Sequence, residues 1–428
     1  MSSITDEIAR SITTKTSVPV VFHGFVNNWA LCQWSVEKWT DTFGDKEFPF
    51  RCMNKDFQSD EPCWERKCKV KNMTFKKFLE AVPSSDEWMY FDYKYVHEWF
   101  SVNNEIYKEV SWQQFGYPDK GPADTTLWVG SAGAHTPVHR DTYGVNIVTQ
   151  VYGKSCLISS SSPVHQLTPQ VKHRWILFPP ESGGLKPSRV PYEESSIYSE
   201  MNFFCPINIQ EFRGLTGARV VDLSAGDALV VPHGWWHYVQ NDDPVNISLN
   251  MWLPHEKDKS SRLSEAAVKI FVAQICKDLP RETVKEIVNP NEDDLPDTPL
   301  AVLFLQLEAA ADQCLDKKRK AHRIKRQRTV EDDHSTPETL HVEYDLKALV
   351  DNPANKMAIA PIITGQELIK LLEDNKKRYV NETRSPRDDE VDSSAVSSSI
   401  CLTKDVINSF CQSNVIDLFK ENLLSRMS

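Results

Sequence analysis

The stretch GAHTPVHRD, residues 133–141, decides both the fold and the chemistry that this sequence predicts. It ends in His139-Arg140-Asp141, which places a histidine and an aspartate two positions apart. Side chains two positions apart on a strand project from the same face, so the imidazole and the carboxylate would point toward one place. A His-x-Asp triplet is common by chance, and the sequence on either side must therefore support any assignment.

A second histidine stands far along the chain, in a block that is typical of a closing strand. The segment SAGDALVVP, residues 224–232, leads through two tryptophans to His237, and residues 246–252 read as a further strand. If a barrel brings His237 back to His139 and Asp141, the three form a two-histidine, one-carboxylate set. Such a set holds Fe(II) on one side and leaves the other side open to ligands. Zinc is the main competing metal, because the same ligands would bind it.

These blocks, in this order and spacing, resemble the JmjC-domain oxygenases over roughly residues 17–254. The resemblance implies a mainly β fold, a double-stranded β-helix of the cupin type with flanking helices. It also implies Fe(II) and 2-oxoglutarate as cofactors, with His139, Asp141 and His237 as metal ligands and catalytic centre. The chain is most similar to the small hydroxylase-like members, one of which is associated with a small heat-shock protein.

By resemblance, the cosubstrate 2-oxoglutarate lies against a hydroxyl and near two amides. Thr136 corresponds to the hydroxyl, and Asn146 and Asn250 stand where the family places the amides. For both asparagines, ordinary hydrogen bonding within strands is an equally good explanation. We interpret Trp235 and Trp236 as packing residues, and Tyr90, Tyr93 and Lys94 are candidates for the substrate pocket.

The family's cosubstrate lysine is the point at which this sequence departs from the pattern. We interpret residues 155–172 as an insertion, because removing them restores the family's spacing after Gly153. The lysine position is then held by His173, with Lys154 and Lys172 beside it. A histidine binds a carboxylate through charge only when it is protonated, so it is a weaker anchor near neutral pH. This departure bears on 2-oxoglutarate and leaves the metal ligands intact.

The rest of the sequence predicts elements that flank the barrel. Residues 34–43 have helical spacing, with Ser35 as the N-cap and Gly44 as the stop, and Thr74 begins a second helix that ends before Pro83. Residues 262–277 and 301–315 also have the periodicity of helices. The predicted divisions are an N-terminal α/β flank at 17–125, a barrel at 126–254, a helical extension at 255–330, a largely disordered linker at 331–400 and an amphipathic segment at 401–428.

Composition limits the location and the partners that we expect. The net charge of −11 argues against a whole-protein binder of nucleic acid or acidic membranes. No run is long enough to span a membrane, and residues 1–16 lack an apolar signal core, so we expect a cytoplasmic protein with ten reduced cysteines. The basic run Lys317–Arg328 predicts a nuclear import signal, an RNA contact or, as we favour, a solvated helix end.

Two functions stay open from the sequence. The first is an Fe(II)- and 2-oxoglutarate-dependent dioxygenase that hydroxylates a protein side chain, with RNA the less favoured substrate. The second is a catalytically weak or inactive JmjC scaffold that acts as an interaction protein, which the missing lysine favours. Under both hypotheses we expect a protein substrate or partner such as a small heat-shock protein, and a homodimer would be ordinary for the family.

Overall fold

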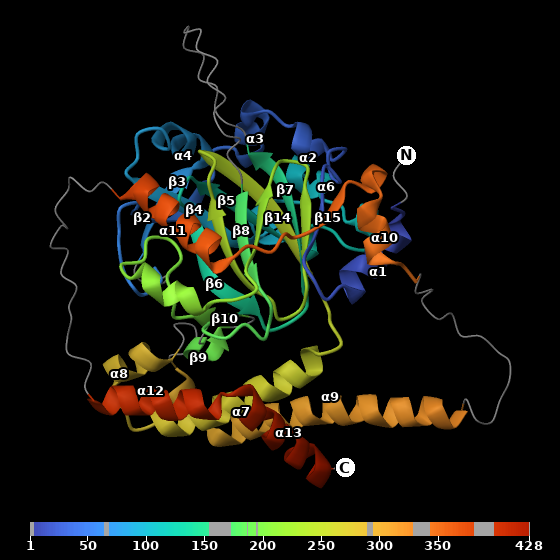
Figure 1. The fold of residues 1–428 in the computed structure, drawn as a ribbon, viewed down its shortest axis with the longest axis vertical. Helices are drawn as coiled ribbons and strands as arrows, with labels where there is room; N and C mark the ends of the chain where they lie inside the picture. Colours follow the sequence, from blue (N-terminus) through green and yellow to red (C-terminus); the bar gives the residue numbers. More distant parts are fainter. Residues whose placement is uncertain are drawn as a thin grey trace, which may run out of the picture.

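The computed structural model describes residues 4–63, 68–153, 173–185, 187–193, 196–288, 294–327, 343–380 and 398–427. Two antiparallel sheets form the upper part of the molecule in Figure 1, and a layer of helices lies beneath them. Among these residues, no helix is long and apolar enough to cross a membrane. The predicted insertion at 155–172 lies outside the described residues, and so do Lys154 and Lys172.

The N-terminal flank packs short helices against the outer strands of the larger sheet. Two predicted helix starts are confirmed, because the hydroxyls of Ser35 and Thr74 each accept a backbone N–H three residues on, at 3.2 Å. Gly44 ends the first of these helices at a φ of 64°, where a Cβ would be strained. The elements are α1 (Asp6–Lys15), β1 (Val20–Phe22), α2 (Ala30–Gln33), α3 (Val36–Phe43), β2 (Glu47–Asn54), β3 (Lys69–Thr74), α4 (Phe75–Ala81), β4 (Glu87–Tyr95), α5 (Val96–Trp99), α6 (Glu105–Glu109), η2 (Gln113–Phe115) and η3 (Pro122–Asp124).

The barrel is the double-stranded β-helix that the sequence predicts. Its larger sheet has the strand order β15-β1-β12-β7-β14-β5-β4-β2-β3, in which β15 is Met357–Ile359, and its smaller sheet has the order β11-β8-β13-β6-β10-β9. Because the chain crosses between the sheets, strands far apart in sequence become hydrogen-bonded neighbours. The barrel strands are β5 (Thr125–Ser131), β6 (His135–Asp141), β7 (Val145–Gly153), β8 (His173–Phe178), β9 (Pro187–Glu193), β10 (Ser196–Ser199), β11 (Arg219–Leu223), β12 (Ala228–Val231), β13 (Trp236–Asn241) and β14 (Val245–Leu253), with η4 (Ile209–Gly214) between β10 and β11.

Apolar side chains from both sheets fill the barrel interior. Trp175 and Leu177 of the smaller sheet pack in one buried cluster with Val148 and Leu229 of the larger sheet. Full burial of such a side chain stabilises the fold by about 1.5–3 kcal/mol. Val239 belongs to the same cluster and lies two residues beyond His237, so this packing also fixes the strand that carries the histidine.

The helices after the barrel form the lower layer, in which α7 packs against α9, α12 and α13 (Figure 1). The predicted helices at 262–277 and 301–315 are confirmed, and the second runs on to Gln327. The backbone of the basic run lies in the last turns of that helix, while its side chains and Arg328 fall outside the described residues. The elements of this layer are α7 (Asp258–Cys276), α8 (Arg281–Ile287), η6 (Leu295–Asp297), α9 (Leu300–Gln327), α12 (Ser398–Phe410) and α13 (Ser413–Met427).

The structure differs from the expectation of a largely disordered linker at 331–400. Residues 343–380 form α10 (Leu346–Asp351), η7 (Pro353–Asn355), β15 (Met357–Ile359) and α11 (Gly365–Tyr379), and they return to the barrel. β15 pairs with the edge strand β1, which supplies its backbone with hydrogen-bond partners. α11 buries Leu368 and Leu372 in the apolar cluster outside the smaller sheet. Local composition does not reveal these long-range partners, and burial against them outweighs the polarity of the segment.

Candidate metal centre

The three predicted metal ligands meet inside the barrel. His139 and Asp141 lie on β6, and His237 lies directly opposite His139 on the neighbouring strand β13. The ring centroids of the two histidines are 4.1 Å apart, and His139 Nε2 lies 3.9 Å from Asp141 Oδ1. The candidate ligand atoms all lie within 4.8 Å of one another, and all three residues are buried. Strand pairing therefore assembles the set that the sequence could only propose.

Backbone carbonyls orient both histidine rings. His139 Nδ1 lies 2.9 Å from the carbonyl oxygen of Pro137, and His237 Nδ1 lies 3.0 Å from that of Trp235. A carbonyl can only accept, so each Nδ1 carries the proton and each Nε2 keeps its lone pair. Burial, reinforced by His237, lowers the pKa of His139 well below its ordinary value. The His139 ring is consequently neutral near pH 7, which is the form that binds metals.

Two side chains hold the carboxylate of Asp141. Its Oδ2 accepts a hydrogen bond from Trp252 Nε1 at 2.9 Å and one from Asn146 Nδ2 at 3.3 Å. Burial raises the pKa of Asp141, while His237 and these two hydrogen bonds act in the opposite direction. The donors leave Oδ1 facing His139 and fix the plane of the carboxylate, as partners of ligating groups do in metal sites.

The predicted amides belong to the same hydrogen-bond network. Asn250 Nδ2 donates to Asn146 Oδ1 at 3.4 Å, which links it through Asn146 to Asp141. Asn250 Oδ1 accepts from Thr126 Oγ1 at 3.0 Å and from Trp128 Nε1. The structure thus brings both asparagines to the candidate centre, although their side chains are engaged with protein partners.

A bulge in β6 turns Thr136 toward the candidate metal ligands. His139 pairs with His237 and Thr136 pairs with Val239, so three steps on β6 match two steps on β13. Cross-strand partners share a face of the sheet, and the extra residue therefore places Thr136 on the inner face with His139. His135, one residue earlier, lies on the opposite face and stacks on Phe204 at 4.3 Å.

Tyr90 is the candidate pocket residue that contacts a predicted site residue. Its hydroxyl lies 3.4 Å from Thr136 Oγ1, and burial raises its pKa, so it stays protonated as a donor. Tyr93 adopts a positive φ of 51° and sets its ring 5.6 Å from that of Trp252. Lys94 reaches back toward the ring of Phe91, with Nζ 5.9 Å from the centroid. Tyr90 and Tyr93 therefore flank the candidate centre on the side of β4.

The position at which the family places a lysine holds a neutral histidine. His173 Nδ1 lies 2.8 Å from Gln150 Oε1, and Gln150 Nε2 donates to Tyr152 O, so the amide orientation makes His173 Nδ1 the donor. His173 Nε2 is buried and has no hydrogen-bond partner among the residues that the structure describes. Burial lowers the pKa of His173 to about 3. The ring offers a lone pair and no positive charge at neutral pH, which does not fit a carboxylate.

Three aromatic rings beside the ligands were not assigned a role from the sequence. Trp252 donates to Asp141, the ring of Tyr198 stacks on His139 at 5.3 Å, and that of Trp175 stacks on His237 at 5.5 Å. Trp252 could have been found, because it lies two positions beyond Asn250 on one strand and shares its face. Tyr198 gave no such signal, since only the pairing of β10 with β6 places it there.

The packing interpretation of Trp235 and Trp236 agrees with the structure. Both are buried, and Trp235 Nε1 donates to the carbonyl oxygen of Ser17 at 3.1 Å. The guanidinium of Arg140 lies 5.0 Å from the ring centroid of Trp236. These contacts tie the segment before His237 to the rest of the barrel.

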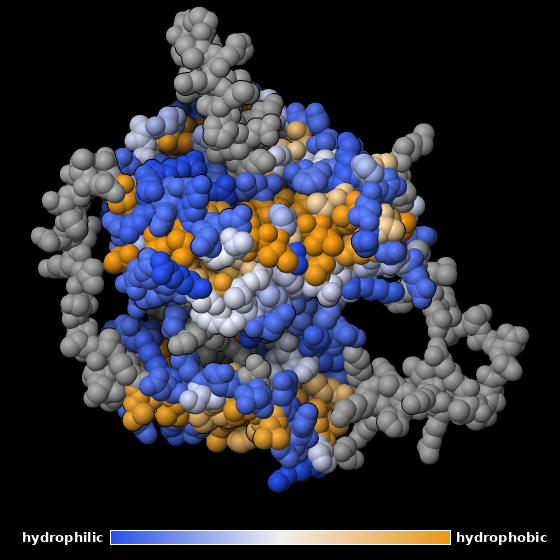
Figure 2. Space-filling view, in the orientation of Figure 1, coloured by the Kyte–Doolittle hydropathy of each residue, from blue (hydrophilic) through white to orange (hydrophobic). Residues whose placement is uncertain are grey.

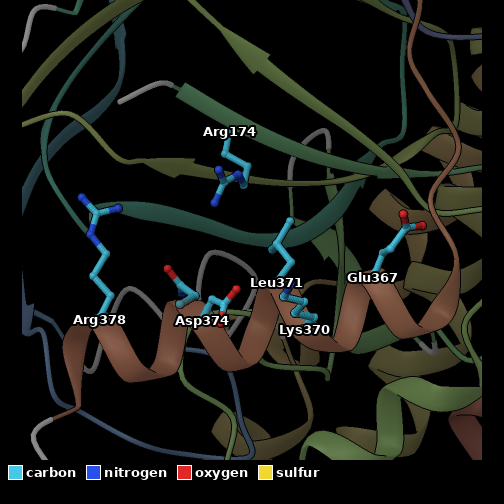
Figure 3. A pocket seen from close by; sticks show the side chains of 7 residues that line it. Arg174, Glu367, Lys370, Leu371, Asp374 and Arg378 are labelled. Atoms are coloured by element: carbon cyan, nitrogen blue, oxygen red, sulfur yellow. The ribbon is translucent and has the colours of Figure 1, made fainter. Parts of the chain in front are cut away.

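A separate hollow between β8 and α11 lies outside the barrel (Figure 3). Arg174 lines it from the outer face of β8, opposite to the face that carries Trp175. Two carboxylates hold Arg174, those of Asp222 at 2.9 Å and Asp242 at 3.2 Å, and Asp242 also pairs with Arg378 at 3.0 Å. These ion pairs neutralise the two arginines and fasten α11, so the hollow is not part of the candidate centre.

Comparisons with known proteins agree with this geometry. The profile of the cupin-like domain matches residues 6–259. The chain is 31% identical to the HSPB1-associated protein 1 homolog of Danio rerio, over 82% of this chain and 74% of that protein. It is 32% identical to HSPB1-associated protein 1 of Homo sapiens, over 78% of this chain and 68% of that protein. It is 25% identical to lysine-specific demethylase JMJ30 of Arabidopsis thaliana, over 57% of this chain and 51% of that protein. With the barrel, the profile match and these relatives in agreement, the chain belongs to the cupin-like JmjC family.

Proposed function

We propose that this chain is an Fe(II)- and 2-oxoglutarate-dependent dioxygenase that hydroxylates a protein side chain. The observation that carries the proposal is the buried cluster of His139, Asp141 and His237. Two oriented imidazoles and one hydrogen-bonded carboxylate are the donors that hold Fe(II) on a single face. When bound, Fe(II) would supply the activation of O₂ that inserts oxygen into a C–H bond of the substrate.

The residues around the ligands would position the reactants and limit water. The rings of Tyr198 and Trp175 cover the two histidines, and Tyr93 packs beside Trp252. Such a wall excludes solvent from one side of the metal position and so guards against side reactions. Rigid strands carry these rings, which suits a site that must hold its geometry.

Two hydroxyl groups near the candidate centre favour binding of 2-oxoglutarate, and His173 disfavours it. The hydroxyls of Tyr90 and Thr136 lie 3.4 Å apart and can donate to the two oxygens of one carboxylate. His173 lies on the same inner face as Thr136. Val239 pairs with both Thr136 and Trp175, and His173 is two residues from Trp175 on β8. The lone pair of His173 Nε2, which has no partner in the described part of the chain, would repel a carboxylate at neutral pH. The proposal therefore rests on the hydroxyl pair for anchoring the cosubstrate.

An anaerobic titration of Fe(II) and 2-oxoglutarate tests this function. We expect a visible metal-to-ligand charge-transfer band in the full chain, and none in a variant that carries His139→Ala and Asp141→Ala. A His173→Lys variant should form the band at a lower concentration of 2-oxoglutarate. Repeating the titration without residues 155–172 would show whether that segment hinders binding. Bound iron without any band in the parent, in His173→Lys and in the chain without residues 155–172 would overturn the dioxygenase proposal.

The neutral His173 specifically favours a second function, that of an interaction protein on an oxygenase scaffold. The relatives' names describe association with HSPB1, and we propose that this chain likewise binds a small heat-shock protein. The surface that we favour is the lower helical layer, on which apolar residues gather in Figure 2. The exposed apolar residues of α12 and α13 are Leu402, Val406, Val415 and Leu418.

Purified small heat-shock protein and full-length chain, tested by pull-down, would separate the two functions. We expect the variant with His139→Ala and Asp141→Ala to bind as well as the parent, and the chain lacking residues 398–427 to lose binding. A cut after residue 254 is a poor test, because it would strip β15 from β1 and expose a sheet edge. If the parent chain itself captures no heat-shock protein, the partner proposal fails.

A further inference from the structure

A second group of metal-ligating side chains lies where the barrel joins the lower helical layer. It comprises His233, His255 and Asp258, whose candidate ligand atoms lie within 4.8 Å of one another. The three residues come from the loop between β12 and β13, the segment after β14 and the first residue of α7. We propose that these residues form a second metal site, which binds a divalent cation of the zinc class and fastens α7 to the barrel. This inference is independent of the proposed oxygenase activity.

The three side chains lie close together at the end of the barrel. The imidazoles of His233 and His255 lie face to face, with centroids 4.6 Å apart and planes at 13°. His233 Nδ1 lies 4.0 Å from Asp258 Oδ1, which is too long for a hydrogen bond. The side chains of His233 and Asp258 are only 13% and 14% exposed. Two rings and a carboxylate thus lie close together, and the stacked rings would have to turn for a lone pair from each to reach one ion.

Backbone groups hold the carboxylate in place for a further ligand. Asp258 Oδ1 accepts from Gly144 N at 2.9 Å, and Asp258 Oδ2 accepts from His255 N at 2.8 Å. Each carboxylate oxygen can accept twice, so both retain capacity toward a cation. These bonds fix the carboxylate beside the rings before any metal arrives, which lowers the ordering cost of binding.

The histidines can take the form that a metal requires. His233 Nδ1 lies 3.3 Å from the carbonyl oxygen of Gly144, so this nitrogen carries the proton and Nε2 keeps its lone pair. Burial and the neighbouring His255 lower the pKa of His233, which favours the neutral ring. His255 Nδ1 accepts a hydrogen bond from Lys257 N at 3.3 Å. A neutral imidazole has one lone pair, so His255 would lose this long hydrogen bond when it binds a metal.

The donor types select the class of metal. Imidazole nitrogen and carboxylate oxygen together suit zinc, whereas calcium and magnesium prefer sets made of oxygen alone. Ligands held about 2.0–2.1 Å from a tetrahedral zinc are about 3.4 Å apart, so the ligand atoms would have to approach by up to about 1.4 Å as the rings turn toward the ion. Water would supply the fourth ligand.

Zinc stoichiometry in tag-free, chelator-treated full-length protein tests the proposal. The background is the variant with His139→Ala and Asp141→Ala, which lacks the first site, and the probe is Zn²⁺ alone in competition with a chromophoric chelator. We expect one equivalent of zinc in this background and none after adding His255→Gln. Loss of a mere supporting group costs 10–100-fold in metal affinity, so loss of a ligand should exceed about 100-fold.

Matched variants keep the outcome clear. His97 is an exposed histidine that belongs to neither cluster. Adding His97→Gln to the same background should therefore leave one equivalent of zinc bound. Asp258→Asn should weaken zinc as His255→Gln does, and near-UV circular dichroism of the metal-free forms should match the background. No zinc in the background protein, or undiminished zinc in the His255→Gln form, would overturn the site. In a protein that keeps His139 and Asp141, His255→Gln should still bind one equivalent of zinc at the first site. The two sites can therefore fail independently of each other in this experiment.

Discussion

Trp252→Phe should weaken metal binding at the first centre although Trp252 is not a ligand. The substitution keeps an aromatic ring next to Tyr93 and removes the indole N–H that donates to Asp141 Oδ2 at 2.9 Å. A hydrogen bond to a charged group contributes about 1.5–3 kcal/mol, and partners of ligating groups cost 10–100-fold in affinity when removed. One tenfold step in affinity corresponds to about 1.4 kcal/mol, so the two measures agree on a loss of roughly 10–100-fold.

The same change should shift the pH dependence of metal binding. Hydrogen bonds from Trp252 and Asn146 lower the pKa of Asp141 against the effect of burial. Without the indole donor that pKa rises further, and the carboxylate protonates at a higher pH. Metal binding requires the charged carboxylate, so the acid limb of the affinity profile should move toward neutral pH in Trp252→Phe.

Anaerobic competition between the protein and a chromophoric chelator for Fe(II), across pH, measures both effects. Trp128→Phe is the matched control, because Trp128 Nε1 donates to Asn250 and Thr126, one step further from the metal. We expect it to lose less affinity than Trp252→Phe. An Fe(II) affinity in Trp252→Phe that stays within about twofold of the parent, in a protein that keeps its near-UV spectrum, would refute the idea that this hydrogen bond holds the ligand.

Three further outcomes follow from particular contacts. His173 has a folded pKa of about 3, below its unfolded value of about 6.5, so the unfolded chain takes up the proton first and stability falls as pH drops through that window. His173→Gln should therefore lessen the acid loss of unfolding free energy by up to about 1.4 kcal/mol per pH unit, and an unchanged slope in urea titrations would contradict this. Leu372→Ala should cost about 2–5 kcal/mol of unfolding free energy, because Leu372 lies on the buried face of α11 in the apolar cluster, and a loss below about 1 kcal/mol would show that α11 docks loosely. Thr136→Val should raise the 2-oxoglutarate concentration needed for the charge-transfer band while leaving Fe(II) affinity unchanged, whereas parallel loss of both would mean a general disturbance of β6.

The sequence by itself determined the fold class, through its resemblance to the JmjC family, and which three residues are the candidate metal ligands. Residues two apart on a strand share a face, so His139 and Asp141 could be paired from spacing alone. Helix starts at Ser35 and Thr74 were likewise local, because a hydroxyl that caps a helix acts within three residues.

Only the tertiary structure decided the contacts that depend on pairing between distant strands. A bulge that spacing does not reveal turns Thr136 inward, and pairing of β10 with β6 brings Tyr198 onto His139. The ordering of 343–380 against the barrel arises in the same way, because its backbone and apolar side chains find partners hundreds of residues away. The second histidine cluster exists only where β14 meets α7, since its members share no periodicity within one element. Local chemistry thus set which residues could act, and long-range packing set which of them meet.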